Sequence, residues 1–504
     1  MRNDINKVFQ AFLKHYEIFE YLGSSLSLLT WDQEVVMPKR GGGPRATVCG
    51  AMAEVIHNRL NSVEFKAICD SLKSSLDSLT DTEQRMFRRF LHGAERSWKI
   101  PSELTNAIAT QASLGQSIWA EARRSDNYGV FEPELDKIVD LKRREADIVG
   151  YADHPYDALI DEYEPGMTTT ELDHLFQSVI SRVQDIRYRL RAKVGTSINN
   201  TISLTANEQM EFVRALAPYL GFDFDSGRID EGDHPATNFI HHNDVRIIAR
   251  SEDGSIATGV FLTIHELGHA AYYNNIDSKY LNTPLFGGAS TAFQEAIARF
   301  WENIICKSAQ FWAGVEMHAN QFPKTGFNRY SGSLIFTEIN RVSDSPIRFK
   351  VDEMSYLLHI YIRFLIERDL ISGSIRAKDI PDVWNGRMHE LLGVKVNTNA
   401  EGCLQDVHWS CGLIGYFPTY FLGSLYGVHI YSSMKKALPR CTEDIEKLDF
   451  ASILSWLRDN IFQHGAYYSA EELLLRLSVS ETSLTEGYVG YLEEKEKTVT
   501  RVTS

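Results

Sequence analysis

Hydrophobic positions recur at three- and four-residue spacing along most of this chain. The pattern is clear in residues 9–22, and it returns at 51–60, 83–91 and 135–149. Because an α-helix has 3.6 residues per turn, this spacing places the apolar side chains on one face of each segment. The pattern therefore predicts a chain built mainly of packed helices. The first of them is an amphipathic N-terminal helix, and it has no uninterrupted apolar core of the kind found in a secretory signal.

Turn residues divide the helical pattern into separate segments. Proline, alone or with glycine, marks breaks at 37–44, 99–102 and 164–167, and a new periodic run follows each break. Residues 168–171 read Thr-Thr-Thr-Glu, the capping-box pattern that opens a helix. The chain contains no low-complexity stretch and no fixed-period repeat, so we expect neither a disordered linker nor a solenoid.

One stretch, residues 237–262, has a different pattern. Residues 244–250 and 255–262 are rich in β-branched side chains, and Ser251-Glu-Asp-Gly254 between them has the composition of a hairpin turn. The pattern predicts a small β-ribbon in a chain that is otherwise all-α. The ribbon has two possible roles: an edge to which an extended peptide adds, or a purely structural hairpin.

Immediately after this stretch the chain reads His265-Glu-Leu-Gly-His269. Two histidines four residues apart lie on one face of a helix, one turn above each other, so both can bind one metal ion. Glu266 lies beside them, where its carboxylate can accept a proton from a metal-activated water. The alternative is a buried helix that carries two histidines by chance, but the narrow spacing favours a metal site.

A catalytic zinc-type site needs a third protein ligand and keeps one position for water. Glu295 lies in an otherwise apolar stretch, where an unpaired carboxylate would be costly unless a cation faced it. Pairing with Arg299, one turn later, is the competing explanation for Glu295. Glu302 is the competing ligand, and spacing alone leaves the choice between the two glutamates open.

The composition restricts the class of protein. The 504 residues are 43% hydrophobic and 24% charged, and the formal net charge is −15. This acidic balance argues against a nucleic-acid partner, because nucleic-acid binders concentrate lysine and arginine to contact phosphates. No run approaches the roughly 20 apolar residues of a membrane-spanning helix, so we expect no membrane association. The six cysteines include no Cys-x-x-Cys pair, which predicts free thiols in a reducing cytoplasm.

Further short motifs follow a fixed order along the chain, and with the His265 region they resemble one known family. They lie at 29–38, 156–166, 295–302, 347–353, 406–410, 415–420 and 456–458. Together they are similar to the carboxypeptidase Taq family, also called thermostable carboxypeptidase 1. The resemblance runs nearly from end to end of the chain.

This resemblance implies a fold and an activity. The implied fold is all-helical, similar to neurolysin and angiotensin-converting enzyme, with two helical lobes around a deep groove. We expect one catalytic unit in which 1–236 form a mainly helical lobe, 237–262 the ribbon, and 263–504 the metal-site and C-terminal helices. The implied activity is that of a cytoplasmic, homodimeric metallocarboxypeptidase, which removes single amino acids from peptides with a free C-terminus.

The resemblance also implies a metal site. His265, His269 and Glu295 would bind one divalent metal ion, and Glu266 would act as the general base. Zinc is the expected ion, with cobalt or manganese as alternatives.

On the substrate side, the resemblance implies that Arg348 binds the terminal carboxylate of the peptide. An ion pair between Arg348 and Asp352, four residues later, is the alternative that the spacing itself suggests. The candidates that would lie along the substrate and stabilise the oxyanion are His408, Tyr416 and Tyr420. His234 and Arg246, from the region of the ribbon, are further candidates for substrate binding.

Six positions depart from the family pattern: Gln294, Ala296, Ile297, Ala236, Ile248 and Val351. Substitution of a residue next to the metal ligands typically lowers metal affinity or activity by about 10–100-fold. The departures therefore motivate an alternative function, a catalytically weak relative that keeps the metal as a clamp and binds peptides or a partner in its groove. Glu266 argues against this alternative, because a purely structural metal site needs no base.

Overall fold

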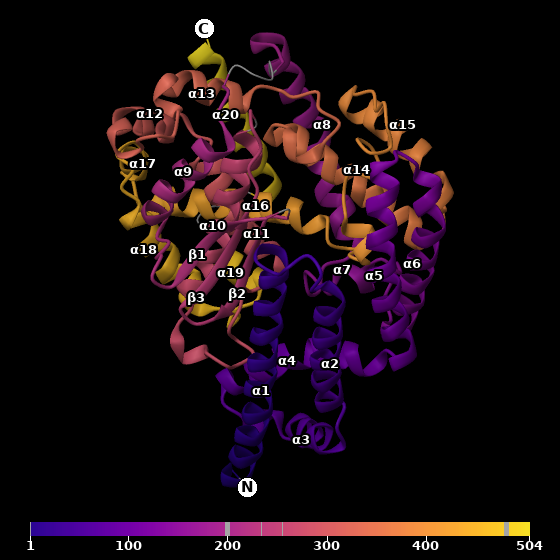
Figure 1. Ribbon diagram of the computed structural model, residues 1–504. Coiled ribbons are helices and arrows are strands. Elements are labelled where there is room, and N and C mark those ends of the chain that lie inside the picture. The colour runs from indigo at the N-terminus through magenta and orange to yellow at the C-terminus, as the bar shows by residue number, and fades with distance from the viewer. Residues whose placement is uncertain (1, 197–201, 233, 255, 478–482, 504) are drawn as a thin grey trace.

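The computed structural model describes residues 2–196, 202–232, 234–254, 256–477 and 483–503 (Figure 1). Its N-terminal half is helical, as the hydrophobic pattern predicts. The helices are α1 (Arg2–Val35), α2 (Gly42–Leu60), α3 (Val63–Ser74), α4 (Asp81–Lys99), α5 (Ser102–Arg124), α6 (Tyr128–Val149), α7 (Asp157–Ile160), α8 (Thr169–Val194) and α9 (Ala206–Leu216). The predicted capping box is present at the start of α8: Thr168 Oγ1 accepts the Glu171 N–H at 3.2 Å, and the Glu171 carboxylate accepts the Thr168 N–H at 2.9 Å.

A small sheet follows α9. It consists of β1 (Gly227–Glu231), β2 (Ala236–His241) and β3 (Asp244–Ala249), in the order β1-β3-β2. β1 runs parallel to β3 and β2 runs antiparallel to it, and a tight turn at Asn243, with φ 63°, joins β2 to β3. The hairpin of the ribbon is therefore β2–β3, and β2 lies at an edge of the sheet.

The predicted strand over 255–262 is wrong for residues 256–262, while residue 255 lies outside the described residues. Residues Ala257–Phe261 form a π-helical segment, η3, which leads into α10 (Leu262–Asn274). The supposed hairpin turn is instead bound to α9, because Asp253 accepts the Ala206 N–H at 2.7 Å and Gln209 Nε2 donates to the carbonyl of Glu252 at 2.7 Å. Tertiary contacts therefore override the β-propensity of this stretch.

The C-terminal half returns to helices. They are α11 (Thr291–Arg299), the π-helical segment η5 (Phe300–Ile305), α12 (Ala309–Met317), α13 (Gly332–Asn340), α14 (Glu353–Ser372), α15 (Ile380–Leu392), the short helix η10 (His408–Cys411), α16 (Pro418–Ala437), α17 (Cys441–Glu446), α18 (Ala451–Asn460), α19 (Ala470–Arg476) and α20 (Leu484–Thr503). Among the described residues, no helix is both long and apolar enough to cross a membrane.

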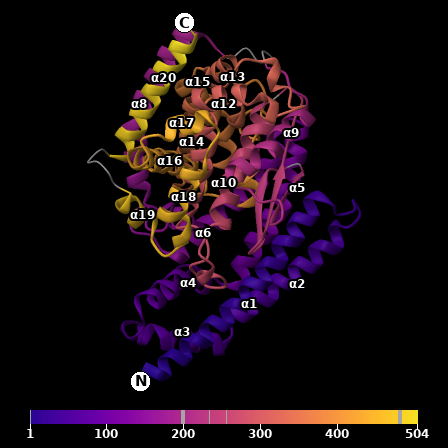
Figure 2. The ribbon, with the colours of Figure 1, turned by 90° about the vertical axis from the view of Figure 1, so that its left-hand side faces the viewer.

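The helices form two masses on either side of a cleft. Figure 1 shows the sheet, α10, α11 and α16 in one mass and α5, α6, α14 and α15 in the other, while the hairpin of α1 and α2 projects below with α3. Figure 2 shows this hairpin projecting from the main body. The cleft has a volume of about 700 Å³ and takes lining residues from both masses. This is the architecture of two helical lobes around a groove that the resemblance implies.

Close packing of α10 against α11 determines where the His-Glu-x-x-His motif lies. A Cβ atom on Gly268 would be 2.7 Å from Ala298 Cα, so only glycine allows the two helices to approach this closely. The approach brings the histidines of α10 beside the glutamates of α11 and η5.

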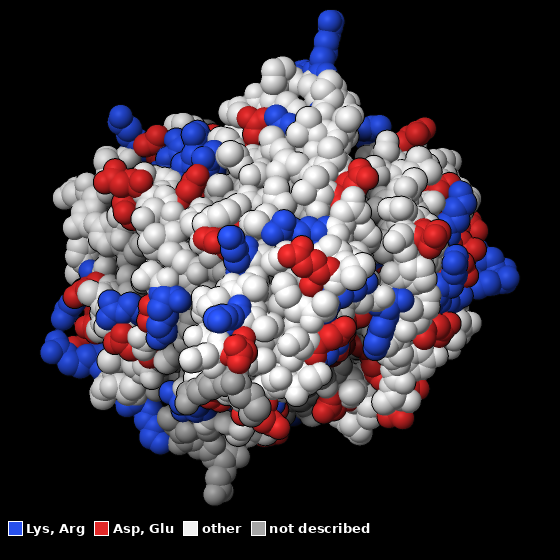
Figure 3. All heavy atoms as spheres, turned by 90° about the horizontal axis from the view of Figure 1, so that it is seen from below, with Lys and Arg blue, Asp and Glu red and all other residues white. Residues whose placement is uncertain are grey.

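The face of the molecule seen from below carries charges of both signs (Figure 3). On the face seen from below, the described basic and acidic side chains are intermixed rather than gathered into one basic surface (Figure 3). Such mixing suits a chain whose net charge is −15, because contact with phosphates requires a concentrated positive patch.

Candidate metal centre and active site

α10 and α11 bring three potential metal ligands together. One ring nitrogen each from His265 and His269, and one carboxylate oxygen of Glu295, all lie within 4.8 Å of one another. His265 and His269 face the same side of α10, with ring centroids 4.9 Å apart. Within the described residues, this is the one cluster of histidine, cysteine and carboxylate side chains that meets this distance criterion.

The cluster fits a divalent ion. Glu295 is buried, and its Oε2 lies 3.3 Å from His265 Nε2 without accepting a well-aligned hydrogen bond. A buried carboxylate oxygen without a partner is costly unless a cation faces it. Two imidazoles and one carboxylate are also a donor set that suits zinc and similar ions.

Glu302 lies behind His265 rather than in the ligand cluster. Its Oε2 is 3.1 Å from His265 Nδ1 and also accepts Arg299 Nη1 at 2.9 Å, while Lys307 Nζ lies 3.2 Å from its Oε1. Arg299 thus pairs with Glu302 and not, as the spacing allowed, with Glu295. A carboxylate on the second ring nitrogen fixes the orientation of a metal-binding histidine, so the geometry favours Glu295 as ligand and Glu302 as its support.

The two carboxylates change the protonation of His265. Burial lowers the pKa of His265, but the contacts with Glu295 and Glu302 outweigh it and raise the pKa to about 9. The imidazole thus lies between two negative charges. The negative charge of the two carboxylates favours a cation at this site.

Both helices that carry the cluster contain a π-helical stretch. η3 leads into α10, and η5 continues α11 and carries Glu302. π-helical turns are rare and occur often at functional sites. Here the η5 stretch places Glu302, seven residues after Glu295, on the opposite ring nitrogen of the same histidine.

Glu266 lies at the cleft and is held by the sheet. It is 9% exposed and lines the cleft next to His265. Thr237, on β2, has its Oγ1 2.8 Å from Glu266 Oε2 and 2.9 Å from the Glu266 carbonyl oxygen. The edge strand therefore contacts the candidate base directly. Sequence reasoning missed Thr237, because nothing in a strand pattern shows which helix its side chains will contact.

Two of the candidate oxyanion groups, His408 and Tyr420, line the cleft, and the third, Tyr416, contacts Glu295. Tyr416 donates its hydroxyl to Glu295 Oε1 at 3.2 Å, and the Tyr420 hydroxyl is 3.4 Å from His408 Nε2. Burial lowers the pKa of His408 to about 4; Asp406 opposes this effect, whereas the positive charge of Arg348 adds to it. His408 is therefore a neutral imidazole at neutral pH.

Arg348 is bound by Asp406, not by Asp352. Its Nε and Nη2 each lie 3.2 Å from Asp406 Oδ1, and its Nη1 donates to the Tyr356 hydroxyl at 2.6 Å. Asp352 instead caps α14, where its Oδ1 accepts the N–H groups of Met354 and Ser355 at 3.0 Å each. The alternative of an Arg348–Asp352 pair is wrong, because a side chain that caps a helix faces its own backbone.

One carboxylate serves two arginines here. Asp406 Oδ2 also accepts Arg363 Nε at 2.7 Å. Burial raises the pKa of Asp406, but Arg363 and Arg348 outweigh burial and hold it well below its usual range. Two guanidinium groups and one carboxylate leave a net positive charge, and Arg348 is the arginine of the pair that lines the cleft. Sequence reasoning missed the contact between Arg348 and Tyr356 and the contact between Asp406 and Arg363, because no spacing pattern connects these residues.

The remaining two candidates differ in position. His234 is exposed and lines the cleft. Arg246 is not among the described residues that line it; its guanidinium is bound to Asp244 through two contacts of 2.8 Å and lies over the Trp31 ring at 4.3 Å. The structure thus brings His234, but not Arg246, to the site.

Four of the six departures from the family pattern lie in the sheet or in the helix core. Ala236 and Ile248 are directly opposite each other on the β2–β3 ladder, so these two departures are one local change. Ala296 and Ile297 are completely buried, in the packing of α11 against α16 and α10. Val351 lines the cleft and Gln294 immediately precedes Glu295, but nothing in the structure explains these two departures.

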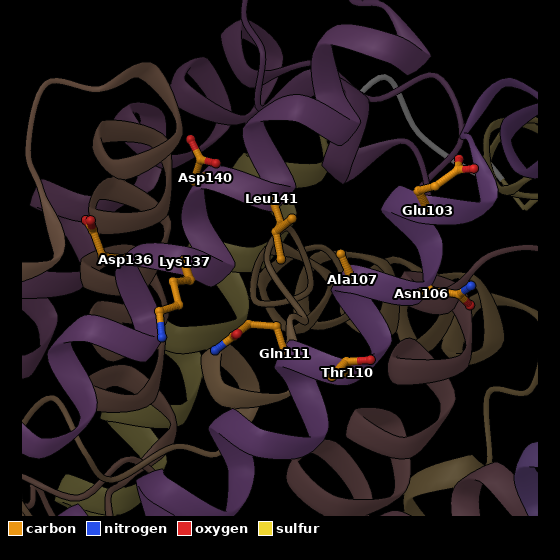
Figure 4. A pocket seen from close by; sticks show the side chains of 9 residues that line it. All are labelled: Glu103, Asn106, Ala107, Thr110, Gln111, Asp136, Lys137, Asp140 and Leu141. Carbon is orange, nitrogen blue, oxygen red and sulfur yellow. The ribbon is translucent and has the colours of Figure 1, made fainter.

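A second hollow lies between α5 and α6 (Figure 4). Its volume is about 740 Å³, and its lining includes Glu103, Gln111, Asp136 and Lys137. It contains no histidine or cysteine and none of the candidate residues. The chemistry is therefore in the cleft and not in this hollow.

Comparison with known proteins agrees with this geometry. The profile of the carboxypeptidase Taq (M32) metallopeptidase family matches residues 11–496. Thermostable carboxypeptidase 1 of Pyrococcus furiosus is 33% identical over 496 residues, which are 97% of this chain and 98% of the relative. Carboxypeptidase 1 of Bacillus subtilis is 33% identical over 88% of this chain and 89% of its own length.

Solved structures agree as well. A Pyrococcus furiosus carboxypeptidase structure, described as Apo-Mg, matches with a TM-score of 0.92 at 32% identity over 97% of this chain and 99% of that chain. An M32 carboxypeptidase from Deinococcus radiodurans has a TM-score of 0.91 at 28% identity, over 98% of this chain and all of that chain. The chain belongs to the carboxypeptidase Taq (M32) metallopeptidase family.

Proposed function

We propose that the protein removes single amino acids from the C-termini of peptides, with one divalent ion held by His265, His269 and Glu295. The observation that carries this proposal is that one cleft is lined by His265 of the ligand cluster, by Glu266 and by the incompletely neutralised Arg348. Membership of a metallocarboxypeptidase family supports the same activity.

Zinc is the ion that we propose. Two histidines and one glutamate form the ligand set of several catalytic zinc sites. Cobalt and manganese accept similar donors and are the alternatives. When bound, such an ion supplies Lewis acidity, which acidifies a water molecule and polarises the scissile carbonyl.

The residues of the chain provide the remaining steps. Glu266 accepts the proton of the attacking water and then returns it to the leaving amine. Thr237 fixes the direction of the Glu266 carboxylate through its hydroxyl contact. Negative charge develops on the carbonyl oxygen in the transition state, and Tyr416, Tyr420 and neutral His408 provide donors toward it.

Arg348 determines which bond is cut. A site that activates water attacks any carbonyl placed next to it, so a fixed cation is needed to select the last peptide bond. A guanidinium binds a carboxylate through two parallel hydrogen bonds. The contacts with Asp406 and Tyr356 hold Arg348 in place and still leave N–H groups for the terminal carboxylate of the peptide.

Metal analysis together with digestion of an N-terminally blocked peptide tests this function. The expected result is about one equivalent of bound metal, release of one amino acid at a time from the C-terminus, and loss of activity on chelation. Release of internal fragments or dipeptides would contradict the carboxypeptidase assignment.

No observation among the described residues favours the alternative of a catalytically weak, metal-clamped binding protein, because Glu266, which Thr237 contacts, and Arg348 both line the cleft. We also propose a cytoplasmic homodimer. Six free cysteines support the reducing compartment, and the family resemblance supports the dimer. Gel filtration with light scattering tests the dimer, and a mass of about 57.3 kDa, that of one chain, would contradict it.

A further inference from the structure

α14 carries three polar side chains at positions where a buried helix would normally be apolar. His359, Arg363 and Glu367 are four residues apart, so they form a stripe along one face of the helix, and all three are completely buried. A buried charge destabilises the fold unless it is paired and hydrogen-bonded. The contacts of Arg363 and Glu367 therefore show which part of the chain these buried side chains bind.

Arg363 holds the start of the loop over residues 405–416. Its Nε and Nη2 lie 2.7 and 2.5 Å from Asp406 Oδ2, and its Nη1 donates to the carbonyl of His359 at 2.7 Å. Its guanidinium also lies 4.6 Å from the Trp384 ring centroid and 5.3 Å from that of Phe417. Hydrogen bonds and aromatic rings thus fix the direction of this side chain.

Glu367 holds the middle and the end of the same loop. It accepts Trp409 Nε1 at 2.7 Å, the Gly415 N–H at 3.0 Å and the Tyr156 hydroxyl at 2.5 Å. At Gly415 φ is +96°, and a Cβ atom there would be 2.6 Å from the Leu159 carbonyl oxygen. The end of the loop is therefore pressed against α7 with no space for a side chain.

These anchors surround the candidate substrate groups. Asp406 and Trp409 lie on either side of His408, and Gly415 immediately precedes Tyr416. Apart from the single turn of η10, residues 405–416 form no regular element, so backbone hydrogen bonds alone do not hold them in one conformation. Catalytic groups have to be held to within about 0.5 Å of their working positions.

We propose that Arg363 and Glu367 are positioning residues, a buried template on α14 that holds the substrate-side loop in its working conformation. This inference rests on the proposed function, because it assigns the loop to substrate. Neither side chain is among the described residues that line the cleft, so both act through the residues that they bind.

The two ends of the template act on different steps. Arg363 acts through Asp406 on Arg348, which binds the free C-terminus, so its loss affects substrate binding. Glu367 acts through Trp409 and Gly415 on His408 and Tyr416, so its loss affects transition-state stabilisation. A change in binding raises KM, whereas a change confined to the transition state lowers kcat.

Glu367→Gln, Glu367→Leu and Tyr156→Phe test the second end. We expect kcat to fall on the order of tenfold in Glu367→Gln and further in Glu367→Leu, because glutamine keeps an acceptor oxygen and leucine keeps none. Tyr156→Phe removes one of three donors and is expected to lower kcat by a few-fold. KM and metal content are expected to stay as in the wild type.

Tyr426→Phe is the matched control. Tyr426 is also buried and also donates its hydroxyl to a buried glutamate, Glu164, at 3.1 Å, and this hydrogen bond does not involve the loop. It is expected to lower thermal stability about as much as Tyr156→Phe without changing kcat. If Glu367→Gln and Tyr156→Phe keep the kcat of the Tyr426→Phe protein, the template is only structural and the proposal is overturned, even if Glu367→Leu does not fold.

Binding without turnover tests the first end. A blocked tripeptide and its C-terminal amide are titrated into full-length Glu266→Gln protein, alone and combined with Arg363→Lys. We expect Arg363→Lys to reduce the preference for the free acid about tenfold, because lysine lacks the two-pronged contact with Asp406. An unchanged preference, or no preference in either protein, overturns the proposal. Failure of the proposed function alone would appear differently, as a wild-type protein that releases no amino acid although the binding preference and its dependence on Arg363 are intact.

Discussion

The two sides of the cleft are built in different ways. On the metal side, the groups come from two regular helices, α10 and α11, and even the supporting carboxylate Glu302 belongs to the continuation of α11. On the substrate side, Arg348, His408 and Tyr416 come from helix ends and connecting segments. The packing of two neighbouring helices places most of the first set, whereas the second set is held by partners from several distant parts of the chain.

This difference leads to a separation of effects. The support of the metal side, from Glu302 and Lys307, comes from the end of the helix that packs on α10, while Arg348 depends on Asp406 and, through it, on α14. Changes on the metal side are therefore expected to affect metal content or the chemical step with every substrate. Changes on the substrate side are expected to affect mainly the discrimination of the free C-terminus.

Glu266→Gln gives the largest effect and tests whether binding and chemistry separate on the metal side. Glutamine keeps the size of the side chain and loses its basicity, so kcat is expected to fall by about 10²–10⁴-fold. Metal content, measured by mass spectrometry of dialysed protein, is expected to stay unchanged. More than about a tenth of the wild-type kcat would show that another group is the base.

Replacement of the two glutamates near His265 tests which of them binds the metal and which only supports His265. Glu302→Gln is expected to weaken metal binding by about 10–100-fold, the usual effect of an outer carboxylate. Glu295→Ala removes a ligand and is expected to weaken it more. Competition with a chelator measures both affinities, and the reverse ranking would exchange the roles of Glu295 and Glu302.

Arg348→Ala tests the substrate side. Loss of a charge-assisted contact with the terminal carboxylate is expected to cost about 1.5–3 kcal/mol, or roughly 10–150-fold in kcat/KM, on free C-termini only. Metal content is expected to be unchanged. Arg246→Ala is the control, because that arginine is bound to Asp244 and Trp31 away from the cleft lining. Equal loss of discrimination in both proteins would contradict the assignment.

The pH dependence of stability gives the smallest effect. The pKa of His408 is lowered from 6.5 to about 4, so between these values the unfolded chain binds a proton that the folded chain does not. The contribution of His408 to the free energy of unfolding is therefore complete above pH 6.5 and falls as the pH drops toward 4. Metal-free His408→Gln protein is expected to show a shallower decline, by no more than about 1.4 kcal/mol per pH unit.

Urea denaturation between pH 4.5 and 7.5 measures this slope. His242→Gln is the control, since His242 is exposed on the turn between β2 and β3. An unchanged slope in His408→Gln would show that His408 titrates as in an unfolded chain, and the neutral imidazole assigned to the oxyanion side would be wrong.

The structure confirms the sequence predictions that depend on local interactions. It corrects those that non-local contacts override. Helical periodicity and the Thr168–Glu171 capping box are local, and the structure confirms both. The strand predicted at 255–262 is wrong because contacts with α9 are non-local. The Arg348–Asp352 pair fails for a related reason: the spacing was suitable, but Asp352 caps α14.

The sequence by itself determined the helical class, the shared face of His265 and His269, and the position of Glu266 beside them, since these follow from 3.6 residues per turn. Tertiary structure alone decided that Glu295 joins the histidines while Glu302 supports His265, because that choice depends on how closely α11 packs on α10 around Gly268. It also decided that Thr237 contacts Glu266 and that Asp406 lies between Arg348 and Arg363. These contacts join residues distant in sequence, and only the packing of the folded chain brings such residues within hydrogen-bonding distance.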